Sequence, residues 1–559
     1  MRPLAMRRYQ TQETVDFVVV GSGASGGVIA RELSKAGLSV VLMEQGPWRK
    51  KEDFFHHDEV GVFARNGFSN DPGRQKQTFR KTENDVAKEN GAGGAFGRVG
   101  YHMMVGGGSV CFTANYWRLH EIDFVEGTRF GGIAGASLVD WPIRYADLEP
   151  YYTRAEWDLG VSGQAGASPF DPPRSRPYPL PPTPVKSSGV LFEKGAKKLG
   201  LHPFPAPLAI ITQPYKGRTP CQHCGFCLAF GCEYGAKSST LFTTIPEAVA
   251  TGKCEVRPNS YVGRVETNDR GRVTGVMYFD QEKREHFQPA RAVVVCANGS
   301  ETPRLLLMSA SKLFPNGLAN SSGVVGKYLM FNGYSANSGL FEGQLNEYKS
   351  VMATRVAHDF YESDPKRGFY GGGGIDARFL AFPTLFALGG LPPDGPQWGL
   401  EYKHMLRDYY THSMNVDGHS TSLPVETNSI SLDPTLKDAW GLPAMRVTYK
   451  DHPDDIAMMK FFQGKCREIL EAAGAKKIWS TPITEQTGGV HLLGTCRMGN
   501  DPKTSVIDRY HRTHDVRNLF LCDGSSMVTG GRGQPTATIQ ALAFRAGELI
   551  AGFARRNEI

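Results

Sequence analysis

The sequence lacks any run of about 18 apolar residues, so it predicts no helix that spans a membrane. Residues 1–17 contain basic side chains but no apolar segment of the kind found in signal peptides, and we expect no export signal there. No cluster of lysines and arginines is long enough to follow a nucleic-acid backbone, because the net charge of +7 is spread over 559 residues. These absences argue against an integral membrane protein and against a nucleic-acid-binding protein.

The distribution of cysteines along the sequence does not indicate a disulfide framework. The chain has ten cysteines, but its 40% of hydrophobic residues suffice for a core that needs no cross-links. Its length is typical of two or three domains or of one large two-lobed enzyme. Six cysteines are scattered singly, mostly beside apolar residues, as buried cysteines usually are, namely Cys111, Cys254, Cys296, Cys466, Cys496 and Cys522.

The other four cysteines lie in one short stretch, Thr219–Lys237. Their spacing is C-x2-C-x2-C-x4-C, and thiolates this close can surround one metal centre. An iron–sulfur cluster suits soft sulfur ligands at short, irregular spacings. A zinc knuckle and a pair of disulfides remain alternatives, although zinc sites usually separate two cysteine pairs by a longer loop. The candidate metal ligands are Cys221, Cys224, Cys227 and Cys232.

The N-terminal part carries a complete nucleotide-binding pattern. The β-branched run Val15–Val20 predicts a buried strand, residues 21–37 predict a glycine turn and a helix, and Leu38–Met43 predicts a second strand. The turn has the spacing G-x-G-x-x-G, and an acidic residue follows the third glycine by 18 positions. Such glycines let the backbone approach a pyrophosphate, and the acid accepts hydrogen bonds from the adenosine ribose. The residues concerned are Gly21, Gly23, Gly26 and Glu44, and NAD and FAD both fit them.

Later segments extend the same α/β pattern. The run Ala292–Ala297 predicts another buried strand, and residues 254–289 predict a small meander of four strands. Helices are expected over Trp141–Gly160 and Phe242–Ala250, and a long one begins near Pro535. Residues 90–108 are rich in glycine and predict a closely packed loop. The fold class is therefore α/β, or α+β when the whole chain is considered.

Together these blocks resemble the glucose–methanol–choline (GMC) oxidoreductases, which use FAD. The cysteine stretch narrows the resemblance to the large subunits of bacterial FAD sugar dehydrogenases, of the gluconate 2-dehydrogenase, FAD glucose dehydrogenase and glucoside 3-dehydrogenase type. The resemblance covers both ends and the middle of the chain, and its C-terminal blocks are more specific than the N-terminal glycines. It rests on residues 21–26 with Glu44, Val105–Ser109 (VGGGS), Asn298–Ser309 (NGSETPRLLLMS), His491–Gly499 (HLLGTCRMG), Asp523–Ser525 (DGS) and Gln534–Ile539 (QPTATI).

The resemblance implies a Rossmann-like FAD-binding domain built from separated segments, together with a discontinuous substrate-binding domain that contains a β-sheet. Carried onto this chain, the FAD-binding domain comprises residues 1–110, 217–330 and 484–559, including the cysteine stretch 219–237. The substrate-binding domain comprises residues 111–216 and 331–483. The implied FAD contacts, beyond the N-terminal pattern, are Gly106, Gly107, Ser109, Val262, Asp523, Gly524, Pro535 and Thr536.

Two residues are implied to carry the chemistry. His491 stands in the position of the family's catalytic histidine, and a neutral imidazole suits removal of a hydroxyl proton near neutral pH. The partner position, usually Asn or His in the family, holds Gln534. Because glutamine cannot act as a base, we expect it to position the substrate oxygen by donating a hydrogen bond. Residues Glu426, Asn428, His404 and Tyr402 are further candidates for the substrate pocket, although surface or core positions are the commoner fate of each.

The resemblance also bears on the cofactors. In the relatives a three-iron cluster occupies the cysteine stretch; Cys221, Cys227 and Cys232 match its ligands best, and Cys224 is supernumerary. Some relatives attach FAD through a histidine, and Cys111 occupies the matching place here. We therefore expect non-covalent FAD, with a cysteinyl link as the alternative.

The function implied is oxidation of a secondary ring alcohol of a pyranose, glycoside or sugar acid, with hydride transfer to flavin N5. Electrons would then pass through an iron–sulfur cluster to a cytochrome-type acceptor. A small subunit carrying the export signal would place the protein at the periplasmic face of the inner membrane, and a cytoplasmic location is the alternative. An oxygen-using alcohol or sugar oxidase and a non-catalytic flavoprotein or assembly subunit are the competing functions.

Overall fold

A computed structural model describes residues 6–54, 59–64, 71, 73–90, 98–379 and 382–559. Most of the predicted glycine-rich loop at 90–108 is included, but residues 91–97 lie outside the described ranges. Within those ranges, no helix combines the length and the apolar character that crossing a bilayer requires.

The first sheet is the nucleotide-binding core. Its strand order is β6-β2-β1-β9-β8-β7, and β17 also pairs with β9. Pairing is parallel from β6 to β9, whereas β7 and β8 form an antiparallel extension. The strands are β1 (Val15–Val20), β2 (Val40–Met43), β6 (Cys254–Arg257), β7 (Tyr261–Thr267), β8 (Val273–Phe279), β9 (Glu285–Val295) and β17 (Leu519–Leu521).

The predicted strand–helix–strand unit is confirmed. Helix α1 (Gly26–Lys35) follows β1 and its glycine turn, and every residue of β2 is buried. Continuous apolar strands such as β1 occur where a parallel sheet is covered on both faces. The strands expected at 286–289 and 292–297 form one element, β9, because Gln288 and Pro289 pair with β8 while Val293–Val295 pair with β1.

The second sheet faces the first across the molecule. Its strand order is β16-β10-β13-β12-β11-β5, and the pairs are antiparallel. One face packs beneath helices α5 (Ser187–Lys198) and α10 (Pro453–Ala473) through residues such as Ile375, Ala377 and Val416. The strands are β5 (Phe204–Pro205), β10 (Gly333–Leu340), β11 (Ala353–Ala357), β12 (Gly373–Arg378), β13 (Ser413–Ser420) and β16 (Lys477–Ser480).

A third, four-stranded sheet has the order β14-β15-β3-β4. It joins β3 (Gln77–Arg80) and β4 (Lys88–Glu89) to β14 (Ser429–Lys437) and β15 (Pro443–Thr448), so it draws strands from both predicted domains. The domain boundaries drawn from the sequence stay a prediction.

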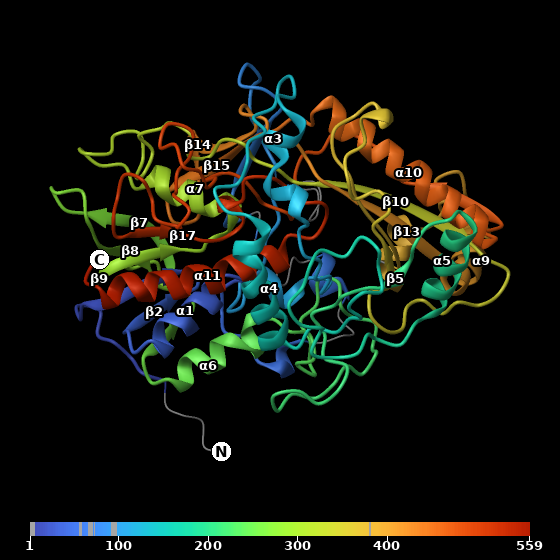
Figure 1. Ribbon diagram of the computed structural model, residues 1–559, viewed down its shortest axis with the longest axis horizontal. Helices are drawn as coiled ribbons and strands as arrows, with labels where there is room; N and C mark the ends of the chain where they lie inside the picture. The colour runs from blue at the N-terminus through green and yellow to red at the C-terminus, as the bar shows by residue number, and fades with distance from the viewer. Residues whose placement is uncertain (1–5, 55–58, 65–70, 72, 91–97, 380–381) are drawn as a thin grey trace.

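Figure 1 shows α11 in red lying along α1 in blue at the nucleotide-binding side, with α10 in orange over β10 and β13 at the other side. The other α-helices are α2 (Gly108–Cys111), α3 (Glu126–Phe130), α4 (Tyr145–Leu159), α6 (Thr244–Ala250), α7 (Asn298–Met308), α8 (Pro383–Leu385), α9 (Gly399–His412) and α11 (Thr536–Arg555). Shorter helical turns are η1 (Lys51–Asp53), η2 (Val60–Ala64), η4 (Glu121–Phe124), η5 (Thr240–Phe242), η6 (Pro365–Arg367), η7 (Phe386–Gly390) and η8 (Gly524–Ser526).

Candidate active site

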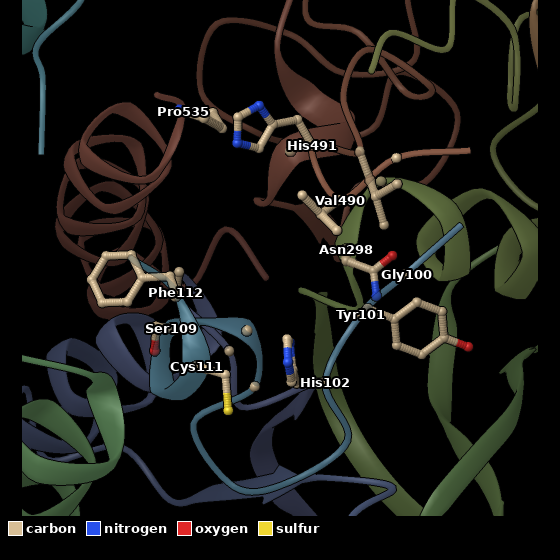
Figure 2. Close-up of a pocket in the computed structure, with 18 of the residues that line it drawn as sticks. Gly100, Tyr101, His102, Ser109, Cys111, Phe112, Asn298, Val490, His491 and Pro535 are labelled. Atoms are coloured by element: carbon tan, nitrogen blue, oxygen red, sulfur yellow. The ribbon is translucent and has the colours of Figure 1, made fainter. Parts of the chain in front are cut away.

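A cavity of about 920 Å³ lies between the nucleotide-binding sheet and the second sheet. Its lining combines the glycine turn after β1, the start of α11, the 484–493 segment and strands of the second sheet. In Figure 2 the ring of His491 extends towards Pro535 on one wall, and Ser109, Cys111 and His102 lie on the wall opposite. The cavity therefore brings the predicted cofactor and catalytic segments together.

The glycine turn leaves room for a pyrophosphate. A Cβ atom at Gly23 would meet no atom within 4 Å, and this residue lines the cavity. By contrast, a Cβ atom at Gly26 would lie 1.8 Å from the carbonyl oxygen of Gly21, so α1 reaches the turn only without a side chain. The first turn of α1 has neither a side-chain cap nor an acidic residue. The backbone nitrogens of Gly27 and Val28 already donate to the carbonyl oxygens of Gly23 and Ser25, so an anion would be bound by the positive end of α1 and the turn that precedes it.

Glu44 is buried at the end of β2 and lines the cavity. Its Oε2 accepts hydrogen bonds from the backbone nitrogen of Ser22 at 3.1 Å and from the Ser22 hydroxyl at 2.7 Å. Oε1 accepts one from the backbone nitrogen of Gly46 at 3.0 Å. Burial raises the pKa of Glu44, while these donors act to lower it. The carboxylate thus holds the glycine turn in place and keeps lone pairs for a ligand.

Asp523 anchors the C-terminal part of the cavity wall. Its Oδ1 accepts a hydrogen bond from the backbone nitrogen of Ser525 at 2.7 Å. Its Oδ2 accepts from the Thr302 hydroxyl at 2.6 Å and from the backbone nitrogen of Asn298 at 3.1 Å. The carboxylate thereby connects η8 to the start of α7.

Helix α11 directs its N-terminus at the cavity. Pro535 precedes the helix, and Thr536 and Ile539 in its first turns also line the cavity. The first turn has no side-chain cap and no acidic residue. Its positive end would stabilise negative charge on a bound group.

The remaining predicted cofactor residues divide into two groups. Gly26 and Gly106 support the glycine turn without lining the cavity. The backbone nitrogen of Gly106 donates to the Ser22 hydroxyl at 3.0 Å, and Gly106 has a φ of +96°. The group that lines the cavity directly comprises Gly107, Ser109, Val262 and Gly524, in addition to the residues already described.

His491 lies in the cavity wall and is half-buried. Burial, together with the nearby His419 and Arg378, lowers the pKa of His491 to about 4. Among the described residues its ring makes no hydrogen bond, which leaves both nitrogens to the cavity and its contents. The imidazole is therefore neutral around pH 7 and suited to accept a proton.

Gln534 also lines the cavity, and its Nε2 lies 3.4 Å from Nδ1 of His419. His419, on β13, is itself buried and part of the cavity wall. The sequence analysis did not identify His419, nor Tyr334 on β10 or Arg378 on β12, which also line the cavity. They come from three strands of the second sheet, which only sheet pairing brings together.

The pocket residues suggested from the sequence lie elsewhere. Glu426 pairs with Lys327 at 2.8 Å on the surface, and the Tyr402 hydroxyl donates to the carbonyl oxygen of Ala387 at 2.6 Å. Asn428 is buried but its amide bonds the backbone of Lys450, and His404 is exposed on α9. All four are absent from the lining of the cavity among the described residues. Surface and core positions are the commoner fate of such polar residues, as the sequence analysis noted.

The four clustered cysteines are free and half-buried, so no disulfide joins them. Burial raises the pKa of Cys227 to about 12, and the thiols of Cys221, Cys224 and Cys232 add to this effect. The other three cysteines are thus close enough to influence the pKa of Cys227. Within the described ranges, no three His, Cys, Asp or Glu side chains converge as the ligands of a single metal ion.

The cysteine stretch contacts the cavity. Leu228 and Ala229, which lie between the cysteines, are part of the lining. The backbone nitrogen of Ala229 donates to the carbonyl oxygen of Cys111 at 3.0 Å. Cys111 itself is buried in the cavity wall, and burial raises its pKa to about 12, so it is a protonated thiol.

A Rossmann-type half whose cavity opens onto a neutral histidine and a helix N-terminus defines an oxidoreductase that uses a dinucleotide cofactor. Family models described as GMC oxidoreductase match residues 16–329 and 424–543. The chain belongs to the GMC oxidoreductase family, and it is an FAD-dependent enzyme that acts on CH–OH groups.

Three relatives match almost the whole chain. A 2-methyl-1,2-propanediol dehydrogenase of Mycolicibacterium austroafricanum is 36% identical, over 96% of this chain and 95% of the relative. The gluconate 2-dehydrogenase flavoprotein of Pantoea cypripedii is 30% identical, over 96% and 93%. The fructose dehydrogenase large subunit of Gluconobacter japonicus is 29% identical, over 96% and 98%. The resemblance to sugar dehydrogenase flavoproteins is thereby confirmed.

The fold is also shared with solved structures. Pyridoxine 4-oxidase from Mesorbium loti superposes with a TM-score of 0.63 at 16% identity, over 96% of this chain and 99% of the oxidase. The cavity fits FAD, because open space at Gly23 adjoins the positive end of α1, which no side chain caps, and a second uncapped helix start, that of α11, faces the same space.

Proposed function

We propose that the protein is a dehydrogenase that oxidises a secondary ring alcohol of a pyranose, glycoside or sugar acid. The observation that carries this proposal is the neutral His491 in the wall of a cavity that also holds the nucleotide-binding turn. Relatives that act on gluconate and on fructose, by their names, support a sugar as substrate.

In this proposal His491 accepts the hydroxyl proton through a ring nitrogen. FAD, when bound, accepts the hydride that leaves the carbinol carbon. Gln534 holds the substrate oxygen in place, and the N-terminus of α11 at Pro535 and Thr536 stabilises negative charge on the flavin ring. The residues proposed to hold FAD are Gly21, Gly23, Gly26, Glu44, Gly106, Gly107, Ser109, Val262, Asp523 and Gly524.

The attachment of FAD is proposed to be non-covalent. A covalent link through Cys111 would need its sulfur to react as a thiolate. Burial keeps the thiol protonated, since its pKa is raised to about 12. This argument supports FAD that denaturation releases.

We further propose that Cys221, Cys224, Cys227 and Cys232 hold an iron–sulfur cluster of the three-iron type. Their free thiols, mutual electrostatic influence and half-buried position support this donor set. A cluster passes single electrons, and its loop contacts the cavity wall through Ala229 and Cys111. Electrons would leave by this route for a cytochrome-type acceptor.

A partner subunit belongs to the same proposal. One relative is by name a large subunit, which supports a multi-subunit assembly. The partner would carry the export signal and place the enzyme at the periplasmic face of the inner membrane.

A second candidate substrate is a small diol, because the relative at 36% identity is named for 2-methyl-1,2-propanediol. Anaerobic mixing of the FAD-loaded protein with a panel of sugars, sugar acids, glycosides and this diol tests both candidates. Bleaching of the flavin by a sugar or sugar acid supports the first candidate, and bleaching by the diol alone supports the second. If none of these alcohols bleaches the flavin, both candidate substrates are wrong.

Two further measurements separate the competing mechanisms. Re-oxidation of the bleached flavin by air at a rate matching turnover would identify an oxygen-using oxidase. Electron paramagnetic resonance of the oxidised protein, with iron and zinc analysis, separates a three-iron cluster from zinc in the cysteine stretch.

A further inference from the structure

The cavity-facing side of the second sheet carries a buried chain of polar groups. Strand pairing sets Asp376 on β12 opposite Asp417 on β13, so residues two positions away along each strand share the same face. That face therefore includes Arg378 and His419, and both line the cavity. The opposite face packs against α5 and α10.

The chain begins with an ion pair. The guanidinium of Arg378 donates to both carboxylate oxygens of Asp376, through Nε at 2.6 Å to Oδ1 and through Nη2 to Oδ2. The amide of Asn115 donates to Oδ2 at 3.1 Å. Although burial acts to raise it, Arg378 and His419 hold the pKa of Asp376 below its usual range. Asp376 is thus a fixed, ionised acceptor.

This carboxylate favours one tautomer of His419. Oδ2 of Asp376 lies 3.2 Å from Nε2 of His419, a charge contact that is not aligned as a hydrogen bond. A proton on Nε2 is favoured there, because the neighbouring carboxylate can only accept one. Burial and the nearby Arg378 lower the pKa of His419, so the ring is neutral and Nδ1 is an acceptor. The ring is also packed between Tyr334 and Trp117, with centroid distances of 5.3 and 5.7 Å.

The acceptor nitrogen in turn fixes the Gln534 amide. With Nδ1 unprotonated, the Gln534 group 3.4 Å away must be the amide nitrogen, which donates one of its hydrogens. The amide oxygen makes no hydrogen bond among the described residues, and the side chain lines the cavity. Gln534 therefore offers the cavity one acceptor and one remaining donor, the pattern that a hydroxyl group satisfies on both sides.

We propose that Arg378, Asp376 and His419 lock the Gln534 amide so that it binds a second hydroxyl of the substrate, on a carbon next to the one oxidised at His491. The inference rests on the proposed function and names its substrate class more narrowly, as vicinal diols. His491 and Gln534 line one cavity, and His419, which contacts Gln534, lies close enough to His491 to influence its pKa, so all three residues face the same substrate space. His419 acts here as a positioning residue. The expected role of Gln534 is thereby reversed, because its amide oxygen accepts a hydrogen bond from the second hydroxyl of the substrate.

The test compares two alcohols that differ by one hydroxyl, 2-methyl-1,2-propanediol and 2-methyl-1-propanol, by anaerobic flavin reduction in the FAD-loaded full chain. If a pyranose is the better substrate, that pyranose and its analogue deoxygenated at the neighbouring carbon replace the pair. For the wild type we expect kcat/KM to favour the diol by about 100-fold or more, since a polar site left unpaired rejects the smaller analogue. Most of the preference should appear in KM.

Four variants show which residues cause the preference for the diol over the mono-alcohol. His419→Phe and Gln534→Leu should reduce the ratio to about 10-fold or less, because each variant costs the diol more than the mono-alcohol. His419→Asn should keep most of the preference, because its amide oxygen can accept from Gln534. His491→Ala should slow both alcohols equally and leave the ratio unchanged. FAD content, measured by absorbance, confirms that each variant is folded.

The outcomes separate the two proposals. If the wild type oxidises both alcohols equally well, the diol inference is wrong and the dehydrogenase proposal stands. A preference that survives in both His419→Phe and Gln534→Leu would also overturn the inference. If no alcohol reduces the flavin, the proposed function itself fails, and the inference with it.

Discussion

The ammonium group of Lys237 donates a hydrogen bond of 2.7 Å to the carbonyl oxygen of Cys227. The same group donates to the carbonyl oxygens of Phe230 at 2.8 Å and Phe112 at 2.9 Å, and the side chain is buried. Phe112 belongs to the wall of the cavity. One cation therefore connects the cysteine stretch to the wall of the cavity.

Replacing this cation tests the connection. Lys237→Met leaves three buried carbonyl groups without their donor, and we expect it to lower the free energy of unfolding by about 3 kcal/mol. It should also reduce the iron content of the purified protein more than the FAD content. Lys216→Met, which removes a half-exposed lysine beside Asp158, should change both little. Equal behaviour of the two variants in urea unfolding and metal analysis would contradict the role of Lys237.

The cysteines themselves should matter after the chemical step. We expect Cys227→Ser and Cys232→Ser to leave single-turnover reduction of the flavin by substrate within about 3-fold, but to slow reduction of a cytochrome acceptor at least about 10-fold. Cys224→Ser should be mild if three thiolates hold a three-iron cluster. Stopped-flow flavin reduction and steady-state cytochrome assays give the comparison. A matching loss in both assays would mean that these cysteines serve only the fold.

His491 should limit activity on the acid side. Burial, His419 and Arg378 lower its pKa to about 4, so the imidazole becomes protonated, and inactive as a base, only below that value. The kcat/KM for flavin reduction should therefore rise with pH through about 4 and be level towards pH 7. His491→Ala should lose at least about 100-fold at pH 7 and lose the acid limb. His404→Ala, on the exposed part of α9, is the matched control.

Asp417 should make stability depend on pH. It is fully buried, and burial raises its pKa from 3.8 to about 7 although Arg378 and the Tyr334 hydroxyl act to lower it. A carboxyl whose pKa is raised on folding binds a proton that the unfolded chain has lost, so stability falls as pH rises from about 4 to about 7. The loss is on the order of 4 kcal/mol.

Asp417→Asn removes this titration. In urea unfolding, the wild type should lose stability relative to the variant between pH 4 and pH 8 by about that amount. Parallel pH profiles of the two proteins would show that Asp417 titrates normally in the fold.

Gly23 should be needed for FAD rather than for folding. A Cβ atom there has no protein atom within 4 Å, but it would enter the space proposed for the pyrophosphate. We expect Gly23→Ala to keep the unfolding midpoint of the apoprotein and to weaken FAD binding at least about 10-fold. Gly464→Ala, in α10, adds a Cβ atom in equally open space and should keep wild-type affinity. Fluorescence titration with FAD distinguishes them, and acid should release the flavin from the wild type in solution.

Local patterns accounted for much of the fold. The strand–glycine–helix–strand unit around Gly21 was predictable because its hydrogen bonds and burial are decided within 30 neighbouring residues. The sequence did not predict that two expected strands merge into β9, because the polar residue Arg291 looks like a break between them. In the structure, pairing of the residues on both sides of Arg291 keeps it within the strand. Tertiary pairing decided that boundary.

The residues that line the cavity were predictable from the sequence only where a motif marks them. His491 and Gln534 stand in recognisable blocks, whereas His419 and Arg378 come from different strands and meet only through sheet register. A usable signal was present, since Asp376 and Arg378, like Asp417 and His419, are charged or polar residues two apart in otherwise buried strands. Period-two polar pairs inside a buried strand indicate a functional face.

The order of strands in the nucleotide-binding sheet sets the timing of assembly during synthesis. Strand β17, at residues 519–521, pairs with β9 next to β1, at residues 15–20, and α11 packs on α1. A ribosome must therefore translate more than nine-tenths of this sequence before the sheet and the cavity wall can close. Until then the glycine turn has no Asp523 and no α11 opposite it. The space proposed for FAD is therefore completed late in synthesis, so a truncated chain that lacks β17 and α11 should retain little FAD even if β1, α1 and β2 fold.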